Sequence, residues 1–419
     1  MRKFIQILLK FFAKQAIKKY KPLIIGITGS VGKSSTKEAI YQVLKKYFVC
    51  RRNFKNYNNE IGVPLTILGQ DAPGKNLISW FKVFFNSLGI IIFSQKSYPK
   101  ILILEMAADH PSDIKYLTKI APCNIGVVTA IGPSHLEFFK SIENVVREKQ
   151  EIISHLSPTG WAILNYDDER VALMKNKTEA KILTYGLSEK ADVKAVEIIL
   201  DQEWENDKYK IKGLRFKVNY TGSIVPVFLP NIIARSQVYS VLSAIAVGIV
   251  LNLNLIEISE SLSNLSPLPG RMKTIKGINN SLIIDDTYNS SPIAAQSALE
   301  TLAEIKKQPD AKKWAVLGDM LELGAASRGE HLNLGKNVAK AGIDYLVVIG
   351  KEIKAVVEAA QEAGLDKNQI KIYQDSVSAG ESIGQEIKEG DIVLIKGSRG
   401  IHMEEVVKRA VAKISDIEN

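Results

Sequence analysis

The sequence contains little cysteine and no long uncharged apolar run. Its two cysteines, Cys50 and Cys123, are far apart and do not form a CxxC pair. This spacing argues against a disulfide framework and against a cysteine-based zinc site. We therefore expect a protein of a reducing compartment and place it in the cytoplasm.

The apolar stretch at residues 77–93 is interrupted by Lys82, Asn86 and Ser87, so it does not fit a membrane-spanning helix. The chain is 46% hydrophobic and 24% charged, proportions that argue against wholesale disorder and against a polytopic membrane protein. Internal repeats and low-complexity tracts are absent. Because 419 residues exceed one ordinary hydrophobic core, we expect two or three compact units.

Basic residues gather at the N-terminus of a chain whose formal net charge is +10. Within residues 1–21, which contain no Asp or Glu, apolar residues recur at helical spacing, namely Ile5, Leu8, Leu9, Phe12, Ala16 and Ile17. The other face carries Gln6, Lys10, Lys14, Lys18 and Lys21. This predicts a basic amphipathic helix without a signal-peptide cleavage site. The helix either packs on the body of the protein or lies on the inner face of the cell membrane. A nucleic-acid partner is not expected, because no aromatic-plus-basic motif is present.

Beyond residue 22, short β-rich runs alternate with helical patterns, which predicts βαβ units. The expected strands of this part are 23–27, 101–105, 125–130 and 162–165. Alternating residues between 192 and 229, including a strand at 208–220, predict a small antiparallel sheet. A helix is expected over 236–250.

The Pro- and Gly-containing stretch 266–271 has the composition of a linker. After it, strands expected at 282–285, 314–318, 345–349 and 392–396 alternate with helices. The predicted fold class is α/β: a first domain with a parallel sheet plus a small antiparallel sheet, followed by a Rossmann-like α/β domain. We divide the chain into the helix of residues 1–21, a first domain of residues 22–265 and a C-terminal domain of residues 266–419.

A glycine-rich phosphate loop, GITGSVGKSST, occupies residues 26–36. It follows a β run and opens a helix, the context in which backbone N–H groups surround phosphate. Lys33 is expected to neutralise the β- and γ-phosphates of ATP, and Ser34 to offer a hydroxyl to Mg²⁺. Ile27 replaces the glycine of the strict Walker A pattern, so the loop is a shorter variant. The expected nucleotide-binding residues are Thr28, Gly29, Ser30, Val31, Gly32, Lys33, Ser34 and Ser35. The loop predicts that residues 22–265 form a P-loop ATPase domain, which binds ATP.

Further polar residues follow apolar runs. Glu105 ends a strand at the carboxyl edge of a parallel sheet, where a Mg²⁺ ligand is plausible. His135 also follows a strand, and it is either a metal ligand or a packing residue. The cluster of Asn56, Asn58 and Asn59 suits either a polar carboxylated substrate or a turn.

Five segments occur in an order typical of one family: NYNNEIGVP (56–64), EMAADHP (105–111), DDTYN (285–289), GDMLELG (318–324) and KGSR (396–399). Together with the short phosphate loop, they resemble the Mur ligases, and within them the branch that adds D-alanyl-D-alanine to a peptidoglycan precursor. The resemblance runs from about residue 22 to about residue 410.

The resemblance implies further roles. Lys33, Glu105, His135 and Lys149 would be the catalytic residues, with Ser34, Glu105 and His135 as magnesium ligands. Lys149 matches a lysine that many Mur ligases carbamylate, although by sequence alone it is a helix-surface lysine. Nucleotide or amine contacts are implied for Arg271, Asp285, Asp286 and Asn289. Donors to the carboxylate of the incoming amine are implied for Lys396, Ser398 and Arg399, whose alternative is a solvated loop.

The chain departs from the family pattern in three places. ARSQVYS at 234–240 replaces a Gly-x-His-Asn-x-x-Asn pattern, so we expect a relaxed nucleotide preference. Serines replace the threonines after Lys33. Only about 22 residues precede the first strand, where this branch carries a domain that grips a uridine nucleotide, so we expect the acceptor to be held differently.

The implied activity is ATP-dependent amide-bond formation through an acyl phosphate, between a small-molecule or lipid-linked carboxylate and an amino acid or dipeptide. Two alternatives are kept: a Mur-like ligase for a folate-polyglutamate, cyanophycin-like or nickel-tetrapyrrole carboxylate, and a nucleotide-dependent membrane-binding module. The combination of Glu105, His135 and Lys149 favours the enzyme.

Overall fold

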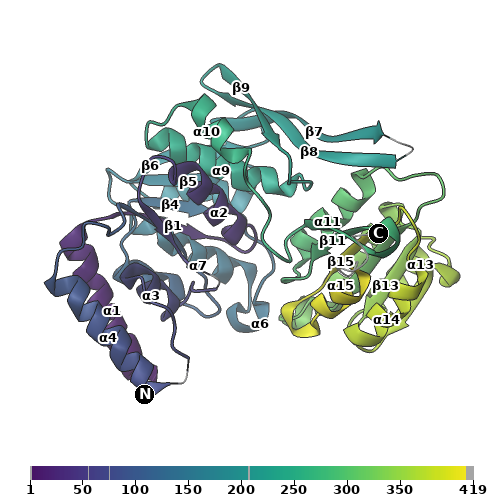
Figure 1. The fold of residues 1–419 in the computed structure, drawn as a ribbon, viewed down its shortest axis with the longest axis horizontal. Helices are drawn as coiled ribbons and strands as arrows, with labels where there is room; N and C mark the ends of the chain where they lie inside the picture. The colour runs from purple at the N-terminus through teal and green to yellow at the C-terminus, as the bar shows by residue number, and fades with distance from the viewer. Residues whose placement is uncertain (1, 55, 75, 206–207, 412–419) are drawn as a thin grey trace, which may run out of the picture.

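The computed structural model describes residues 2–54, 56–74, 76–205 and 208–411. The predicted helix of 1–21, the predicted strands of 192–229 and the predicted domain of 266–419 each include a few residues outside this set. Figure 1 shows two sheet-containing units, with a pair of helices, α1 and α4, on the side of the first unit that lies away from the second.

The first sheet, counted over the described residues, has nine strands in the order β2-β3-β1-β4-β5-β6-β7-β8-β9. In chain order these are β1 (Leu23–Thr28), β2 (Cys50–Arg52), β3 (Ile101–Glu105), β4 (Ile125–Val128), β5 (Trp161–Asn165), β6 (Lys181–Gly186), β7 (Val193–Glu205), β8 (Lys208–Tyr220) and β9 (Ser223–Leu229). Pairs from β2 to β7 are parallel, and β7, β8 and β9 are antiparallel. The predicted antiparallel strands therefore exist, and they continue the parallel sheet instead of forming a separate one.

Helices cover both faces of this sheet. They are α1 (Arg2–Tyr20), α2 (Lys33–Leu44), α3 (Gly62–Leu68), α4 (Leu77–Ile92), α5 (Asp113–Ile120), α6 (Leu136–Phe139), α7 (Ile142–Ser154), α8 (Glu169–Ala172), α9 (Ser236–Val250) and α10 (Leu255–Leu262). Alternate strand residues enter different cores: Ile25 and Ile27 pack with α2 and α9, whereas Ile24 packs with α1, α3 and α7. A strand buried on both sides must be apolar throughout, which explains the run LIIGIT.

The second sheet has six strands in the described chain, in the order β10-β11-β15-β12-β13-β14. They are β10 (Lys273–Lys276), β11 (Leu282–Asp286), β12 (Lys313–Gly318), β13 (Tyr345–Ile349), β14 (Ile370–Tyr373) and β15 (Ile392–Lys396). Its helices are α11 (Pro292–Glu304), α12 (Ser327–Lys340), α13 (Lys354–Glu362), α14 (Ser376–Glu386) and α15 (Glu404–Ala410). Only the β10–β11 pair is antiparallel among these strands, so the Rossmann-like expectation is confirmed.

The N-terminal helix packs against the body of the protein through one face. Ile5, Leu9, Ala13 and Ala16 of α1 are buried, and Leu8, Phe12 and Ile17 are half-buried. These include the apolar positions predicted for the inner face. A search of the described residues finds no helix long and apolar enough to cross a membrane.

Candidate active site

A cleft of about 660 Å³ lies between the two sheets. The first unit contributes the phosphate loop, the segment around Asn58 and the residues after β3 and β4. The second unit contributes residues from the linker, from the segment after β11 and from the end of β15. In both units the cleft is at the carboxyl ends of parallel strands, where α/β sheets bind ligands.

Two glycines give the phosphate loop its shape. Gly29 has a φ of 146°, and a Cβ atom there would lie 2.0 Å from Thr129 Oγ1. Gly32 has a φ of 84° and is the N-terminal capping residue of α2. Larger residues would be strained at either position. The loop therefore directs the first turn of α2 into the cleft, where unpaired backbone N–H groups favour an anion.

Lys33 folds back over the phosphate loop. Its Nζ donates hydrogen bonds to Gly29 O at 2.6 Å and to Ser30 O at 3.1 Å. Burial lowers the pKa of Lys33, and the attraction of Glu105 only partly offsets this effect. An anion in the loop would restore favourable surroundings for the ammonium group.

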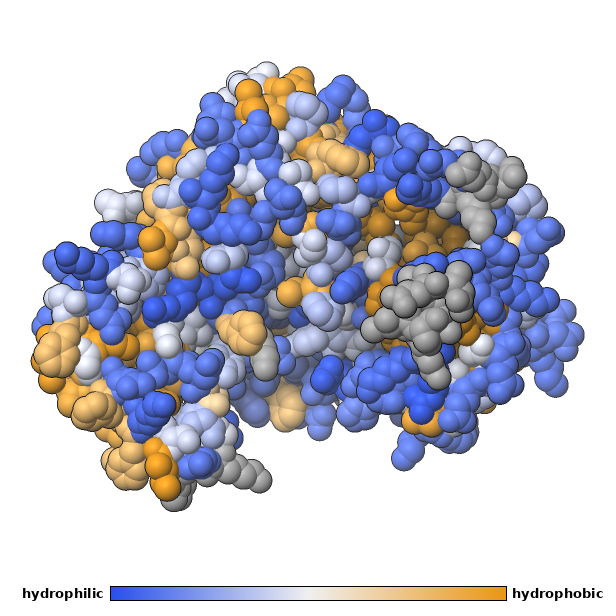
Figure 2. Space-filling model, viewed as in Figure 1, coloured by the Kyte–Doolittle hydropathy of each residue, from blue (hydrophilic) through white to orange (hydrophobic). Residues whose placement is uncertain are grey.

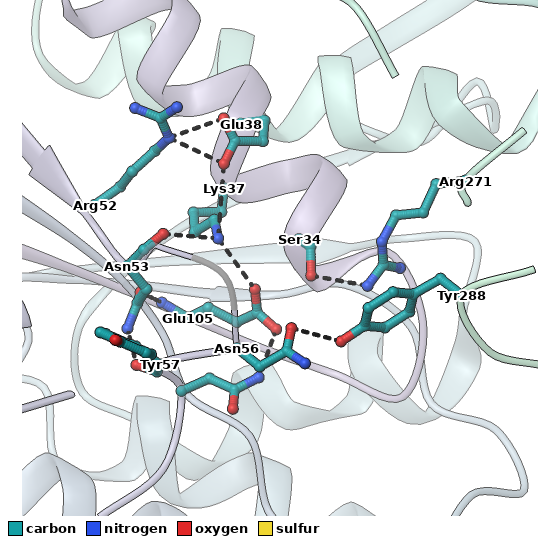
Figure 3. Close-up of polar contacts among 11 residues, drawn as sticks. Ser34, Lys37, Glu38, Arg52, Asn53, Asn56, Tyr57, Glu105, Arg271 and Tyr288 are labelled. Carbon is teal, nitrogen blue, oxygen red and sulfur yellow. Dashed lines mark hydrogen bonds and ion pairs between the residues drawn. The ribbon is translucent and has the colours of Figure 1, made fainter. Parts of the chain in front are cut away.

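Arg271 reaches the phosphate loop from the start of the second unit. Its Nη2 donates to Ser34 Oγ at 3.1 Å, and its guanidinium carbon lies 4.1 Å from the centroid of the Tyr288 ring (Figure 3). Tyr288 in turn donates from its hydroxyl to Asn56 Oδ1 at 2.6 Å. Residues of both units thus meet at Ser34 and at Asn56.

Glu105 is a buried carboxylate at the end of β3. Lys37 Nζ lies 3.6 Å from its Oε2 (Figure 3). Asn58 Nδ2 donates to its Oε1 at 3.0 Å. Burial opposes ionisation of Glu105, but the attraction of Lys37 and Lys33 and the Asn58 hydrogen bond lower its pKa. This carboxylate is therefore held ionised beside the phosphate loop.

His135 stands in the left-handed region with a φ of 51° and lines the same cleft. Its Nδ1 lies 2.7 Å from Glu322 Oε2, and its Nε2 lies 3.6 Å from Asp109 Oδ1. Glu322 belongs to the second unit, so the imidazole lies at the junction of the two units. These surroundings are polar, unlike those of a packed core histidine.

Lys149 is almost completely buried in α7. Its Nζ donates to Ala108 O at 3.5 Å, and it lies 6.0 Å from the centroid of the Phe139 ring. Burial, followed by repulsion from Lys33, lowers the pKa of Lys149 to about 7. Sequence alone indicated a helix-surface lysine, and that reading is wrong for this side chain. Lys149 lies behind the cleft lining rather than within it.

All three asparagines of the predicted cluster, Asn56, Asn58 and Asn59, line the cleft, but they make different contacts. Asn56 contacts Tyr288, and Asn58 contacts Glu105. Asn59 Oδ1 accepts from the backbone of Ile61 at 3.2 Å and Gly62 at 2.9 Å. Asn59 therefore also stabilises a turn, which was the alternative role predicted for this cluster.

Residues of the second unit form a buried network around Lys396. Its Nζ lies 2.6 Å from Asp286 Oδ2 and donates to Asn289 O at 2.9 Å. Asp286 also accepts from the backbone of Met272, while Asp285 accepts from the backbone of Gly270. The two aspartates thus fix the linker and place Arg271. The solvated-loop alternative does not hold for Lys396, whose side chain is 2% exposed.

Ser398 and Arg399 do not line the cleft. Ser398 is buried, and its Oγ accepts from Leu321 N at 2.9 Å. Arg399 is exposed, and its backbone N donates to Asn289 Oδ1 at 3.4 Å. Their contact with an amine substrate stays a prediction.

Comparison with known proteins agrees with this geometry. The Mur ligase middle domain matches residues 86–248, and the glutamate ligase domain of Mur ligases matches residues 270–399. The UDP-N-acetylmuramoyl-tripeptide–D-alanyl-D-alanine ligase of Mycobacterium tuberculosis is 30% identical over 406 residues, covering 93% of this chain and 73% of its own. The Bacillus subtilis enzyme of the same name is 28% identical over 400 residues, covering 96% and 78%.

The chain belongs to the Mur ligase family. The crystal structure of the MurF ligase from Thermotoga maritima in complex with ADP has a TM-score of 0.77 and 28% identity, and the match covers 97% of this chain and 83% of that one. Like the Mur ligases it resembles over nearly its whole length, this protein is an ATP-dependent ligase that forms an amide bond.

Several residues of this Mur ligase site were not singled out from the sequence. Lys37 is 3% exposed and pairs with Glu105, and Tyr288 bridges the units. The position of Lys37, one helical turn after Lys33 on α2, could have indicated it. Tyr288 lies inside the DDTYN segment, but nothing in the sequence indicated that it would contact Asn56.

The segment that departs from the family pattern also borders the cleft. Ser236, Gln237 and Ser240 line it, and Gln237 Nε2 donates to Arg271 O at 3.4 Å. Gln237 Oε1 is buried without a hydrogen-bond partner in the described structure. Arg235 instead turns to the second unit, where it binds Glu304 at 2.7 and 2.8 Å.

Proposed function

We propose that this Mur ligase joins D-alanyl-D-alanine, or a similar amine, to the carboxylate of a muramoyl-tripeptide precursor, as the names of its relatives state for them. The observation that supports this most is the convergence of Lys33, Glu105 and Arg271 in one cleft that also contains Asn58 and Lys396. Such a site can hold ATP on one unit and an amino substrate against the other.

The reaction begins with attack of the substrate carboxylate on the γ-phosphorus of ATP, which releases ADP and forms an acyl phosphate. Lys33 and the backbone amides of the phosphate loop hold the phosphates, and Arg271 adds a positive charge from the second unit. The amine then attacks the acyl carbon, and a tetrahedral intermediate collapses with loss of phosphate and a proton.

The residues fit a magnesium ion. Ser34, Glu105 and His135 would hold Mg²⁺, which would neutralise phosphate charge during transfer. Among the described residues, no three His, Cys, Asp or Glu side chains converge into a metal cluster built from protein alone. This suits Mg²⁺, which is commonly bound by one or two carboxylates together with substrate phosphates.

Lys149 also fits the proposed carbamate. An amine attacks CO₂ only in its neutral form, and the pKa of Lys149 is about 7. The carbamate would convert a buried cation near Lys33 into an anion. That anion would orient the cations of the site and remove the repulsion between the two lysines.

The two units act together in this proposal. We divide them at residues 265 and 266 and assign the ATP to residues 22–265 and the amine to residues 266–419. Contacts across the division include Arg271 with Ser34 and Arg235 with Glu304. Closure along these contacts would exclude water from the acyl phosphate.

The acceptor is either a free or a lipid-linked carboxylate, the latter reached from the inner face of the membrane.

The test is phosphate release from ATP with Mg²⁺ and bicarbonate, using UDP-N-acetylmuramoyl-tripeptide with and without D-alanyl-D-alanine. Release that requires both substrates supports the proposal. If neither substrate stimulates release, the ligase acts on another carboxylate, of the folate-polyglutamate, cyanophycin-like or nickel-tetrapyrrole kind. An Arg271→Met variant should lower this release, because it removes the cation of the second unit that contacts Ser34 of the phosphate loop.

A further inference from the structure

Helix α4 presents an apolar stripe to solvent. Ile78, Phe81, Phe85, Leu88 and Ile92 recur every three or four residues and therefore share one side of the helix. Their exposed fractions are high, reaching 77% for Phe85 and 81% for Ile78. The opposite side, which includes Trp80 and Val83, is buried. A helix that is apolar on both sides needs a second apolar partner beyond the protein core.

Helix α1 extends this apolar surface. The two helices run side by side in the same direction, because Phe12 stacks on Phe84 and Lys19 Nζ donates to Ile91 O at 2.8 Å. On its outer side α1 exposes Phe4, Ile7 and Phe11, which the sequence pattern had not indicated. Figure 2 shows apolar residues gathered over the part of the molecule where Figure 1 draws α1 and α4.

We name as the outer face the exposed apolar side chains of these helices and the residue after α4: Phe4, Ile7, Phe11, Ile78, Phe81, Phe85, Leu88, Ile92 and Phe93. Among the described residues, 22 large apolar side chains are exposed, and nine of them belong to the outer face. A concentration of this kind marks an interaction surface rather than scattered surface residues.

The excess positive charge of the chain lies in the two sequence segments that contain α1 and α4. Residues 1–21 and 72–104 together contain 11 Lys and Arg and no Asp or Glu. The rest of the chain contains 44 Lys and Arg against 45 Asp and Glu, so these two segments account for the whole positive excess. Lys14, Lys18 and Lys21 continue the stripe of Phe4, Ile7 and Phe11, and all three are exposed. Within the described residues, no carboxylate lies within 4.0 Å of their amines.

We propose that the outer face docks on a bilayer that contains anionic phospholipid. Exposed apolar side chains beside unpaired lysines match the boundary between acyl chains and negatively charged headgroups. A second copy of this chain would bring two strongly positive faces together, which charge repulsion opposes. Nucleic acid would satisfy the lysines but would leave the phenylalanines in water.

The docked orientation follows from the position of α1. Arg2 lines the cleft and pairs with Glu60 at 2.7 Å, and Phe4 of the outer face follows two residues later. A molecule resting on its outer face would therefore hold the edge of the cleft near the headgroups. This docking does not depend on the proposed substrates, since it uses no residue assigned to the reaction.

The experiment is flotation of the full chain with vesicles of phosphatidylcholine alone or mixed with phosphatidylglycerol, in the absence of ATP and acceptor. We expect binding to the mixed vesicles only. A Phe81→Glu/Phe85→Glu variant should bind at least about tenfold more weakly, because two apolar anchors are lost. An Ile256→Glu/Ile372→Glu variant is the matched control, since these side chains are 57% and 54% exposed away from the outer face, and it should bind like the natural protein.

Three results would overturn the proposal: no flotation of the natural protein, equal flotation of the two variants, or light scattering that finds a dimer which only Phe81→Glu/Phe85→Glu abolishes. Thermal unfolding and ATP-dependent phosphate release with soluble substrates should be the same for both variants and the natural protein. These activity measurements contain no vesicles, so failure of the proposed reaction and failure of docking are observed separately.

Discussion

Cations lie both around the cleft and beside the outer face of α1 and α4, but their surroundings differ. Lys396 lines the cleft, and Lys37 lies against Glu105 of the cleft lining; both lysines are almost fully buried, and each contacts a carboxylate. Beside the outer face, Lys14 and Lys18 are exposed, and no carboxylate of the described residues lies within 4.0 Å of their amines. Buried, paired cations hold one geometry and recognise a ligand of defined shape. Exposed, unpaired cations act through their summed field and suit an extended anionic surface.

The largest expected effect is on catalysis, from Lys33→Met. Removing one preorganised cation from a phosphate-transfer site should lower kcat about 10²- to 10³-fold. Vesicle flotation should not change, because Lys33 lies in the cleft and not on the outer face. Steady-state phosphate release and flotation on the same preparation check this separation. A loss of both would contradict the distinction between the two regions.

The second expected effect is on stability, from Lys37→Met. It leaves the buried carboxylate of Glu105 without its nearest cation and should lower the free energy of unfolding by about 3 kcal/mol at neutral pH. Urea unfolding measures this loss. The double variant Lys37→Met/Glu105→Gln should recover most of it, because no unpaired charge remains. An additive loss in the double variant would show that Lys37 acts by packing alone.

This stability effect should depend on pH. The pKa of Glu105 is lowered in the fold from its ordinary 4.5, so its stabilisation is fully present above that value. It is lost as the pH falls through the lower folded pKa, where the carboxylate becomes protonated. The difference between the natural protein and Lys37→Met should therefore shrink in acid, which unfolding curves across the acidic range would detect.

The fold was predictable because its signals are local. The apolar run of β1, the glycines of the phosphate loop and the prolines of the linker each determine their own conformation, and the strands of both units appear where these patterns indicate them. The exception is a long-range feature. Strands β7, β8 and β9 join the parallel sheet through β6, and no residue pattern specifies the neighbour of a strand.

The segments that form the site could be predicted from the sequence, but the contacts between their side chains could not. Glu105 was recognised at the end of its strand, yet its partner Lys37 was not. Burial of Lys149 depends on how α7 packs against the first sheet, and a helix-surface pattern cannot reveal it. The outer stripe of α1 was also missed, because Phe4, Ile7 and Phe11 belong neither to the apolar positions nor to the basic face that the helical spacing indicated.

A smaller effect on catalysis is expected from Lys149. If its carbamate orients the cations of the site, Lys149→Met should lower activity about 10- to 100-fold. Stimulation of the natural protein by bicarbonate should increase as the pH rises through about 7, because the neutral amine becomes available. A ¹³C carbamate signal after incubation with labelled bicarbonate, absent from Lys149→Met, checks the modification directly. Equal bicarbonate stimulation of both proteins would exclude it.

The unmodified lysine also makes a prediction for stability. Its folded pKa of about 7 lies below the ordinary 10.5, so between these values the unfolded chain carries a proton that the folded chain does not. Stability from this group therefore rises with pH over that interval and is lowest below it. In the absence of CO₂, the natural protein should gain stability relative to Lys149→Met as the pH rises from 7 to 10. Parallel unfolding curves would contradict the burial of a neutral amine.

The smallest expected effect, from Lys18→Gln, sharpens the comparison most. One lysine near an anionic surface contributes about 1 kcal/mol, so binding to phosphatidylglycerol vesicles should weaken about fivefold at low salt. The loss should disappear at high salt, because exposed charges are screened. Lys367→Gln, at another exposed lysine, should have no effect at any salt concentration. The defect of Lys33→Met should persist at high salt, since a buried cation in a defined site is screened much less than an exposed one. If high salt abolished the defects of both Lys18→Gln and Lys33→Met, the cleft and the surface beside the outer face would use their cations in the same way.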